Sequence, residues 1–434
     1  MDEEEFVISF GDDWIENTIR RINAPTDADT NGSNESLKIS KPPQALLDVR
    51  PESYRPQLLT IGPLHGILSD SASADRCKEL CVWRFMQRQE IPDVKQLMQR
   101  LFDDPRSFLD THYSNPLDYS LERHQLMLTL DSIFIYEFFL SMCATDPESK
   151  TEQNGHFQTL WKNNIIVKQF SRDLFLMGNQ IPMSFLKKLI EDFPRERKLE
   201  LGELNRKLRE LIKIVDPFLT WNFEDENSEI PDFCKCSHLL DCLYVWVCRE
   251  PLQKNGSDAM NLCSIPQLCN LFWRKQEPRQ KTIFGNRLPT ASRLSKASIR
   301  FRVIVGSISV MKYDKTNLRF DLPRLIVNDR TEDVLRNLLA HEQSSKSSGD
   351  FTKYVAIMNS LIDTPEDVAI LTKAQVIENY LGSDEKLVEM WNNMCTNVDI
   401  RACERWDDMT HDVLDGYENP GRSMAMRSIF LSHG

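Results

Sequence analysis

The densest group of side chains that could bind a metal lies between residues 234 and 242. Its members are Cys234, Cys236, His238 and Cys242. A structural zinc site needs four thiolate or imidazole ligands, which usually occur in the sequence as two closely spaced pairs. The spacing CxCxHxxxC differs from that pattern, although His238 and Cys242 share one face if residues 238–242 are helical. We therefore expect buried or half-buried free thiols and no bound metal, with a zinc site as the alternative.

Two carboxylates lie inside a segment that is otherwise apolar. The sequence LMLTLDSIFIYEFFLSM at Leu126–Met142 contains Asp131 and Glu137. A helix that is apolar on nearly every side is buried on most sides. A buried carboxylate must be paired, hydrogen-bonded or protonated, because an isolated buried charge is too costly. We expect a basic side chain or a helix end beside each carboxylate, with a catalytic acid at Asp131 as the alternative.

Common catalytic and nucleotide-binding motifs are absent from the sequence. Neither GxSxG nor HExxH occurs, and there is no GxGxxG or GxxxxGK[ST] phosphate loop. His65, His124 and His341 belong to separate segments, and we expect each to be a core or capping residue. We therefore predict no catalytic residue and no cofactor. An active site built from Asp131, His341 and Glu342 is the alternative.

A run of basic residues without any acid extends from Arg279 to Arg302. Anionic membranes or nucleic acids can bind a patch of this kind. The whole chain, however, has a formal net charge of -12, which disfavours a nucleic-acid-binding protein. We expect these side chains to face solvent and to pair with acidic residues elsewhere, and we predict no nucleic-acid partner.

The stretch at residues 168–190 shows the clearest helix boundaries in the chain. Two apolar blocks flank the residues Gly178, Asn179, Gln180 and Pro182. A left-handed residue at Gly178 or Asn179 can close the first helix, and Pro182 can begin the second one. Asn179 and Gln180 then lie at a corner where two helix ends leave backbone groups unpaired. We expect both amides to clamp that backbone, with a ligand contact as the alternative.

Elsewhere, hydrophobic residues recur mainly at three- and four-residue steps, which predicts amphipathic helices. The period changes to two at Ile299, where apolar residues alternate with arginines, and the alternation returns near Leu318. We therefore predict a mainly α (α+β) fold. It consists of a large helical domain with a small antiparallel β-sheet of two to four strands at residues 299–327.

Composition divides the chain into three parts. Residues 1–45 form an acidic N-terminal segment and a flexible linker, because their polar composition cannot bury enough surface to order the chain. Residues 46–398 form the helical domain, in which residues 250–280 have weak periodicity and are predicted to be a long variable loop. Residues 399–434 form a C-terminal tail.

The cysteines and the N-terminus indicate the cellular compartment. The chain has 11 cysteines, an odd number, and no apolar secretory segment follows Met1. No apolar run reaches the roughly 18 to 20 residues that span a bilayer. We therefore expect reduced thiols in a soluble, cytoplasmic protein.

Five sequence blocks together resemble the plant family called domain of unknown function 247. The resemblance covers roughly residues 51–394, and the order and spacing of the blocks are similar to those of the family. Each block alone would be a weak signal. The blocks are Tyr54-Arg55-Pro56 with Ile61-Gly62-Pro63-Leu64-His65, Met127-Leu128-Thr129-Leu130-Asp131, Asp173 to Pro182, Ala291 to Phe301, and Leu322-Pro323 through Arg336 to Gln343.

We assign a structural role to seven residues of these blocks, and the chain also departs from the family's pattern. Relatives tend to have a bulkier aromatic-histidine sequence where this chain has Leu64-His65-Gly66. Relatives usually carry ENQIP where this chain has GNQIP at residues 178–182, and most relatives continue into a hydrophobic C-terminal helix that looks membrane-spanning. We expect this chain to be a soluble variant or a truncated product without that helix. The resemblance also implies that family members are often membrane-associated through the helix, with the plasma membrane as the alternative location. The residues to which we assign the structural role are Asp131, Asp173, Asn179, Gln180, Pro182, Asn337 and Glu342.

The family has no established enzymatic activity or cofactor, and some members are linked to pollen–stigma self-incompatibility. The resemblance therefore implies a non-enzymatic recognition or signalling protein. We expect it to present residues 250–280 and its N-terminal segment to a protein partner. Two alternatives stay open: a hydrolase or transferase that uses buried carboxylates around Asp131, and a peripheral membrane adaptor that binds through residues 279–302.

Overall fold

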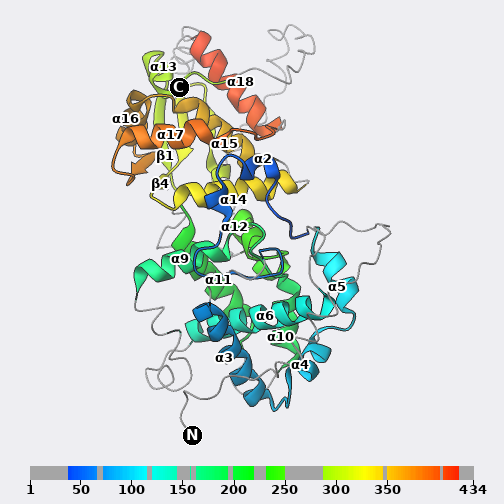
Figure 1. The fold of residues 1–434 in the computed structure, drawn as a ribbon. Coiled ribbons are helices and arrows are strands. Elements are labelled where there is room, and N and C mark those ends of the chain that lie inside the picture. Colours follow the sequence, from blue (N-terminus) through cyan, green and yellow to red (C-terminus); the bar gives the residue numbers. More distant parts are fainter. Residues whose placement is uncertain are drawn as a thin grey trace, which may run out of the picture.

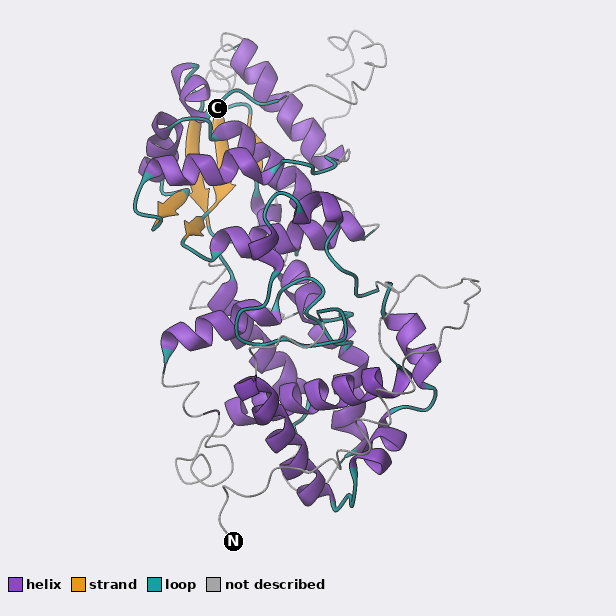
Figure 2. Cartoon of the chain, in the orientation of Figure 1, coloured by secondary structure: helices purple, strands orange, loops and turns teal. Residues whose placement is uncertain are grey.

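Helices dominate the described part of the chain, and the few strands lie close together at one end (Figure 2). The predicted mainly helical fold with a small sheet is therefore confirmed. The predicted loop at 250–280 and residues 1–37 of the predicted N-terminal segment lie outside the described residues. The computed structural model describes residues 38–65, 72–114, 120–143, 157, 163–193, 199–218, 231–249, 287–345, 349–400 and 404–419.

Helix α6 (Leu121–Cys143) forms the centre of the helical lobe (Figure 1). Its apolar residues cover nearly every side, and the main helices that pack around it are α3 (Ala72–Gln89), α10 (Met183–Asp192) and α11 (Leu201–Val215). By length and composition α6 would also suit a membrane span, but 67% of its most apolar window is buried within the fold. The neighbouring helices therefore account for its apolar surface.

Two shorter helices of this lobe begin at aspartate caps. In α4 (Val94–Leu101) the side chain of Asp93 accepts a backbone hydrogen bond, and in α5 (Pro105–His112) Asp104 accepts two. Both caps satisfy N–H groups that a helix start leaves unpaired.

The helix–turn–helix predicted at residues 168–190 is confirmed. Helix α9 (Asn164–Leu174) precedes the turn, Gly178 adopts a left-handed φ of 80°, and Pro182 is the extended residue immediately before α10. The backbone N–H of Met183 donates to the Ser237 carbonyl at 2.8 Å. This bond joins the start of α10 to the turn that precedes α12 (Leu239–Cys248).

The larger sheet has the strand order β1–β3–β2, formed by β1 (Arg300–Ile304), β3 (Arg319–Pro323) and β2 (Lys312–Asp314). The predicted antiparallel pairing holds for β2 and β3, but β1 and β3 are parallel. The physical reason is the connection from β1 to β2. It contains the 3₁₀ turn η4 (Ile308–Val310) and no tight hairpin, so β3 lies between the two strands.

A second sheet pairs β4 (Leu325–Val327) with β5 (Ile377–Asn379) in parallel. Strand β5 lies outside the predicted range of 299–327. It follows shortly after α16 (Pro365–Lys373), and a strand of three residues is too short to show an alternating pattern.

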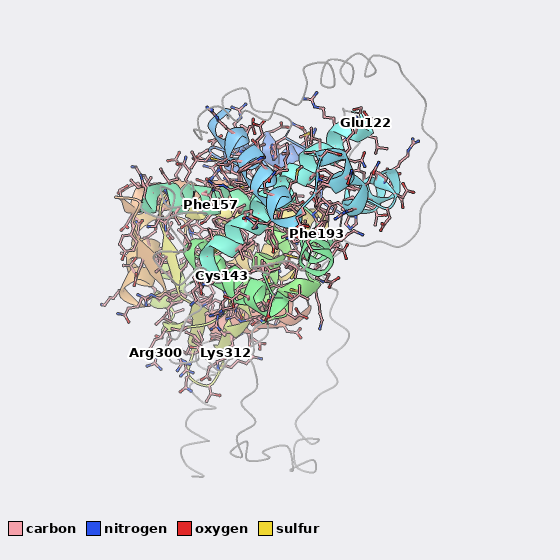
Figure 3. The ribbon with its side chains drawn as sticks, turned by 90° about the horizontal axis from the view of Figure 1, so that it is seen from below. Glu122, Cys143, Phe157, Phe193, Arg300 and Lys312 are labelled. Atoms are coloured by element: carbon pink, nitrogen blue, oxygen red, sulfur yellow. The ribbon has the colours of Figure 1, made fainter. Side chains whose placement is uncertain are left out.

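Helix α14 (Thr331–Ser344) connects the lobe that contains the strands to the helical lobe (Figure 1). It packs against α12, against α15 (Asp350–Leu361) and against the 3₁₀ turn η1 (Pro51–Tyr54). Helices α13 (Ala291–Lys296), α16 and α17 (Asp384–Met394) lie near the strands. Figure 3 shows Arg300 of β1 and Lys312 of β2 on the side of the molecule opposite Glu122, at the start of α6.

The folded part extends beyond the predicted limits of 46–398. Ile39 is 3% exposed and forms a bridge with Tyr113, and α2 (Gln44–Leu47) follows it, so residues 38–45 pack against the domain. Within the predicted tail, α18 (Glu404–Glu418) is a helix with Trp406 and Val413 buried. The apolar residues of α18 recur at helical spacing, but its many acidic residues weaken the signal in the sequence.

Candidate functional site

The carboxylate of Asp173 binds an extended segment of the chain to the end of α9. Its Oδ2 atom accepts hydrogen bonds from the backbone N–H groups of Gln57, Leu58 and Leu59 at 3.0, 2.7 and 3.0 Å. Its Oδ1 atom pairs with the Arg172 guanidinium at 2.8 Å, and both side chains are buried. Burial raises the pKa of Asp173, whereas the three N–H groups and Arg172 favour the charged form. Both carboxylate oxygens are thus engaged within the chain.

Asn179 binds the same extended segment from the turn after α9. Its Oδ1 atom accepts from the Ile61 backbone N–H at 2.7 Å. Its Nδ2 atom donates to the carbonyls of Leu59 at 3.0 Å and Asp173 at 2.7 Å. The Asn179 side chain is fully buried, so these backbone contacts use its amide inside the fold.

Gln180 connects the end of α9 to the start of α12. Its Nε2 atom donates to the carbonyls of Leu174 and Leu176 at 2.8 and 2.9 Å, and its Oε1 atom accepts from the Leu240 N–H at 3.1 Å. These are backbone groups that helix ends leave unpaired. Gly62 lies against this residue with a φ of 72°, and a Cβ there would lie 2.3 Å from the Gln180 carbonyl oxygen. Only glycine fits that approach.

Asn337 brings α14 to the same place. Its Oδ1 atom accepts from the Met177 N–H at 2.7 Å, and its Nδ2 atom donates to the carbonyls of Ser53 at 2.8 Å and Asp333 at 2.7 Å. Asp173, Asn179, Gln180 and Asn337 therefore converge on one buried junction, which we call the amide junction. Three remote parts of the chain, residues 53–62, 173–182 and α14, meet there.

Glu342 acts at another place on α14. Its Oε1 atom accepts from the Tyr244 hydroxyl at 2.6 Å and from the Phe351 N–H at 3.0 Å, and its Oε2 atom accepts from the Thr352 N–H at 2.5 Å. The carboxylate therefore caps the start of α15, where negative charge is favourable.

The carboxylates inside α6 have basic partners. Lys78 of α3 lies 2.6 Å from Asp131 Oδ1, and the Gly62 N–H donates to Asp131 Oδ2 at 2.8 Å. Burial raises the pKa of Asp131, and the charge of Lys78 offsets part of this effect. Glu137 pairs with Arg88 of the same neighbouring helix. These are the contacts of structural ion pairs.

Histidine and acidic side chains meet between α12 and α14. The sequence alone did not place His238, Asp241 and His341 together. His341 Nε2 lies 3.3 Å from Asp241 Oδ1, and the rings of His238 and His341 pack edge to face with centroids 5.3 Å apart. His238 Nδ1 accepts from the Asp241 N–H at 3.2 Å and so caps α12. Asp131 has its partners on other elements, so the suggested set of Asp131, His341 and Glu342 is not gathered around one site.

A small cavity adjoins this histidine group and the amide junction. Its volume is about 10 Å³, which suits about one water molecule and no organic substrate. The histidine and aspartate could exchange a proton with such a water, but the described residues leave no space for a reacting molecule beside them. The lining includes Ile39, Ser40, Gly178, Gln180, His238 and His341.

The buried His238 should make the free energy of unfolding depend on pH. Burial, followed by the charge of His341, lowers the pKa of His238 to about 3. Below a pH of about 6.5 the unfolded chain therefore binds a proton that the folded chain does not, so stability falls as the pH falls. We expect His238→Asn, which keeps a capping acceptor, to reduce this slope by about 1.4 kcal/mol per pH unit between pH 6 and 4.5.

Urea unfolding across this pH range measures the slope, and His411→Asn on the exposed part of α18 is the control. Identical slopes for His238→Asn and the unmodified chain would contradict a neutral buried His238.

The cysteine cluster is part of the packing around α12. The Cys234 thiol faces the Leu201 carbonyl at 4.0 Å, and the Cys242 thiol lies 3.3 Å from the His238 carbonyl. Cys234 and Cys242 are buried, and Cys236 is half-buried. Within the described ranges no group of three or more His, Cys, Asp or Glu side chains is arranged to hold a metal ion.

Three basic residues of the stretch, Lys296, Arg300 and Arg302, contact acids or carbonyls of the strand lobe. Arg302 and Arg319 both pair with the buried Asp321, at 2.6 and 2.9 Å. Lys296 pairs with Glu366 at 3.3 Å. Residues 279–286 of the stretch lie outside the described ranges.

A larger hollow of about 570 Å³ lies between η4, β2 and α18. We call it the α18 groove. Its apolar lining includes Ile304, Met311, Trp406 and Met409, and the exposed Lys312 and half-buried Asp412 lie beside them. The groove does not follow from the predicted tail at residues 399–434, because one of its walls is the helix α18 within that range.

Comparisons with known proteins point to one plant family. The profile of a plant protein family of unknown function, DUF247, matches residues 39–433. Two Arabidopsis thaliana proteins named as UPF0481 proteins are each 24% identical to this chain. One alignment covers 92% of this chain and 85% of the relative, and the other covers 84% and 73%. No solved structure matches. The chain therefore belongs to the DUF247 family of plant proteins of unknown function.

Proposed function

We propose that this chain is a non-enzymatic recognition protein that binds a protein partner in the cytoplasm of plant cells. The amide junction is the observation that carries the proposal. Asp173, Asn179, Gln180 and Asn337 bind backbone groups of their own chain, and the adjoining cavity holds about one water. The family motif thus supports a scaffold, and self-incompatibility, which the family resemblance implies, is one setting for recognition by such a scaffold.

The other two functions have less support. A hydrolase or transferase around Asp131 would need a free carboxylate, whereas Asp131 contacts Lys78 and the Gly62 N–H. A membrane adaptor would need free basic side chains, whereas Arg302 and Lys296 pair with carboxylates. The free thiols of the described cysteines support a reducing compartment.

The α18 groove is the described surface that best suits a partner. Its accessible lining includes the half-buried Ile304, Val310 and Tyr313, and Lys312 is exposed at its edge. Met311, Trp406 and Met409 also line it but are buried. Aromatic side chains such as Tyr313 are enriched where proteins bind one another. A partner segment that inserts apolar side chains and places an acidic residue near Lys312 would complement this lining.

Site-specific cross-linking tests the proposal. A photoreactive amino acid replaces Lys312 in one version of the full chain and Gln99, exposed on α4 in the other lobe, in the control. After irradiation in plant extract, we expect one protein to be linked from position 312 and not from position 99. Deleting residues 250–280 from the version with the cross-linker at position 312 shows whether that predicted loop is also required for capture. Equal or no capture from both positions would contradict recognition through this groove.

A further inference from the structure

Two cysteines near the start of α12 lie around one backbone carbonyl. The Phe233 carbonyl oxygen accepts the Cys236 backbone N–H at 3.1 Å, and the Cys242 Sγ lies 3.7 Å from the same oxygen. Burial, followed by the neighbouring Cys236 side chain, raises the pKa of Cys242. The fold therefore holds both cysteines at the same turn of the backbone before any bond forms between them.

The thiols of this cluster differ in access and direction. Cys236 follows the 3₁₀ turn η2 (Phe233–Lys235) and is half-buried, so a small oxidant can reach it. Cys242 is fully buried one turn into α12. Cys234 faces the Leu201 carbonyl on α11, at 4.0 Å. Cys236 is thus the thiol open to oxidation, and Cys242 is the buried thiol at the same turn, with its sulfur 3.7 Å from the Phe233 carbonyl.

We propose that Cys236 and Cys242 form a reversible disulfide when a hydroperoxide oxidises Cys236. The Cys236 sulfur attacks the peroxide, the O–O bond breaks, and sulfenic acid and water form when the oxidant is hydrogen peroxide. The Cys242 sulfur then attacks the sulfenic sulfur. The S–S bond forms, the S–O bond breaks, and the hydroxyl leaves as water with the Cys242 proton. A thiol reductant reverses the reaction by disulfide exchange.

The position of this disulfide would link redox state to the amide junction. Between the two cysteines, the Ser237 carbonyl accepts the Met183 N–H at 2.8 Å, and the Leu240 N–H donates to Gln180 Oε1 at 3.1 Å. A bond from Cys236 to Cys242 closes the loop that carries both contacts. Oxidation would therefore act on the place where α10 and α12 meet.

Peptide mass spectrometry of the full chain tests the proposal. The reduced protein is treated with hydrogen peroxide, its remaining thiols are alkylated, and it is digested with trypsin. Cleavage after Lys235 and Arg249 yields one peptide with Cys236, Cys242 and Cys248, separate from Cys234. We expect this peptide to carry one alkyl group, on Cys248, and to be about 2 Da lighter than the same peptide with one alkyl group and two free thiols. After reduction it should regain both hydrogens.

Variants identify the roles of the two thiols. Cys242→Ser should abolish the internal bond and leave Cys236 as a sulfenic acid that dimedone traps, whereas Cys234→Ser should leave the bond intact. If the unmodified chain instead shows Cys236 as sulfinic acid, a bond to Cys234 or Cys248, or no change, the proposal is wrong. Because that readout uses the unmodified protein, it does not depend on the folding of the variants.

Discussion

Replacing Asp173 with asparagine is expected to lower the free energy of unfolding by about 3 to 5 kcal/mol, as when one partner of a buried ion pair is removed. The carboxylate faces three backbone N–H donors with one oxygen and Arg172 with the other. An asparagine has one oxygen and one NH₂ group. Whichever way the amide turns, its NH₂ group faces donors and leaves them unsatisfied. Urea unfolding monitored by tryptophan fluorescence measures the loss.

Asp333→Asn is the matched control, because Asp333 also binds Arg172. Its Oδ2 atom lies 2.6 Å from Arg172 Nε, but its side chain is 18% exposed. The amide can turn its oxygen toward Arg172 and its NH₂ group toward water, so we expect a loss of about 1 kcal/mol. Similar small losses for both variants would show that the amide junction does not depend on the Asp173 carboxylate.

The sequence predicts the corner at Asn179 and Gln180, but it does not predict which backbone groups the two amides bind. Helix periodicity and the Gly178 and Pro182 signals are local, and they were enough to predict the turn and the unpaired helix ends. The partners of Asn179 at Leu59 and Ile61 are 120 and 118 residues away. No local pattern encodes such a contact, because it depends on how the helices pack.

The strand order and the buried face of α18 also depend on packing that a local sequence pattern does not contain. Alternation near Ile299 and Leu318 predicted strands, but the parallel pairing of β1 with β3 follows from the path of the chain through η4. In α18, Trp406 and Val413 are buried against the strand lobe, although acidic residues surround them in the sequence. Tertiary packing selects which residues of a polar helix are buried.

The histidines show which contacts a sequence cannot bring together. The sequence predicts His341 as a core or capping residue and leaves His238 as a metal ligand only as an alternative. In the structure the two rings pack together beside Asp241, and His238 caps α12. A helix-cap signal was present in the spacing of His238 and Asp241, but histidine is not among the residues preferred at such a cap.

The Lys78–Asp131 ion pair is expected to show a coupling free energy of at least about 2 kcal/mol in a double-mutant cycle. Lys78 and Asp131 are 9% and 4% exposed, and Lys78 also donates to the Thr60 carbonyl at 2.6 Å. Lys78→Met leaves a buried carboxylate, and Asp131→Asn leaves a buried ammonium. Each variant should lose about 3 to 5 kcal/mol of unfolding free energy. The double variant buries no charge, so it should lose less than the sum.

The cycle tests the structural interpretation of Asp131, because removing either partner of a buried ion pair leaves the other charge unpaired. The exposed pair Lys188–Asp103, with side chains 29% and 90% exposed, is the control, and its coupling should be close to zero. Losses at Lys78 and Asp131 that add within about 0.5 kcal/mol would contradict the ion pair. Strong coupling would instead show that α3, α6 and residues 60–62 depend on this pair for their packing, since Asp131 contacts the Gly62 N–H beside the amide junction.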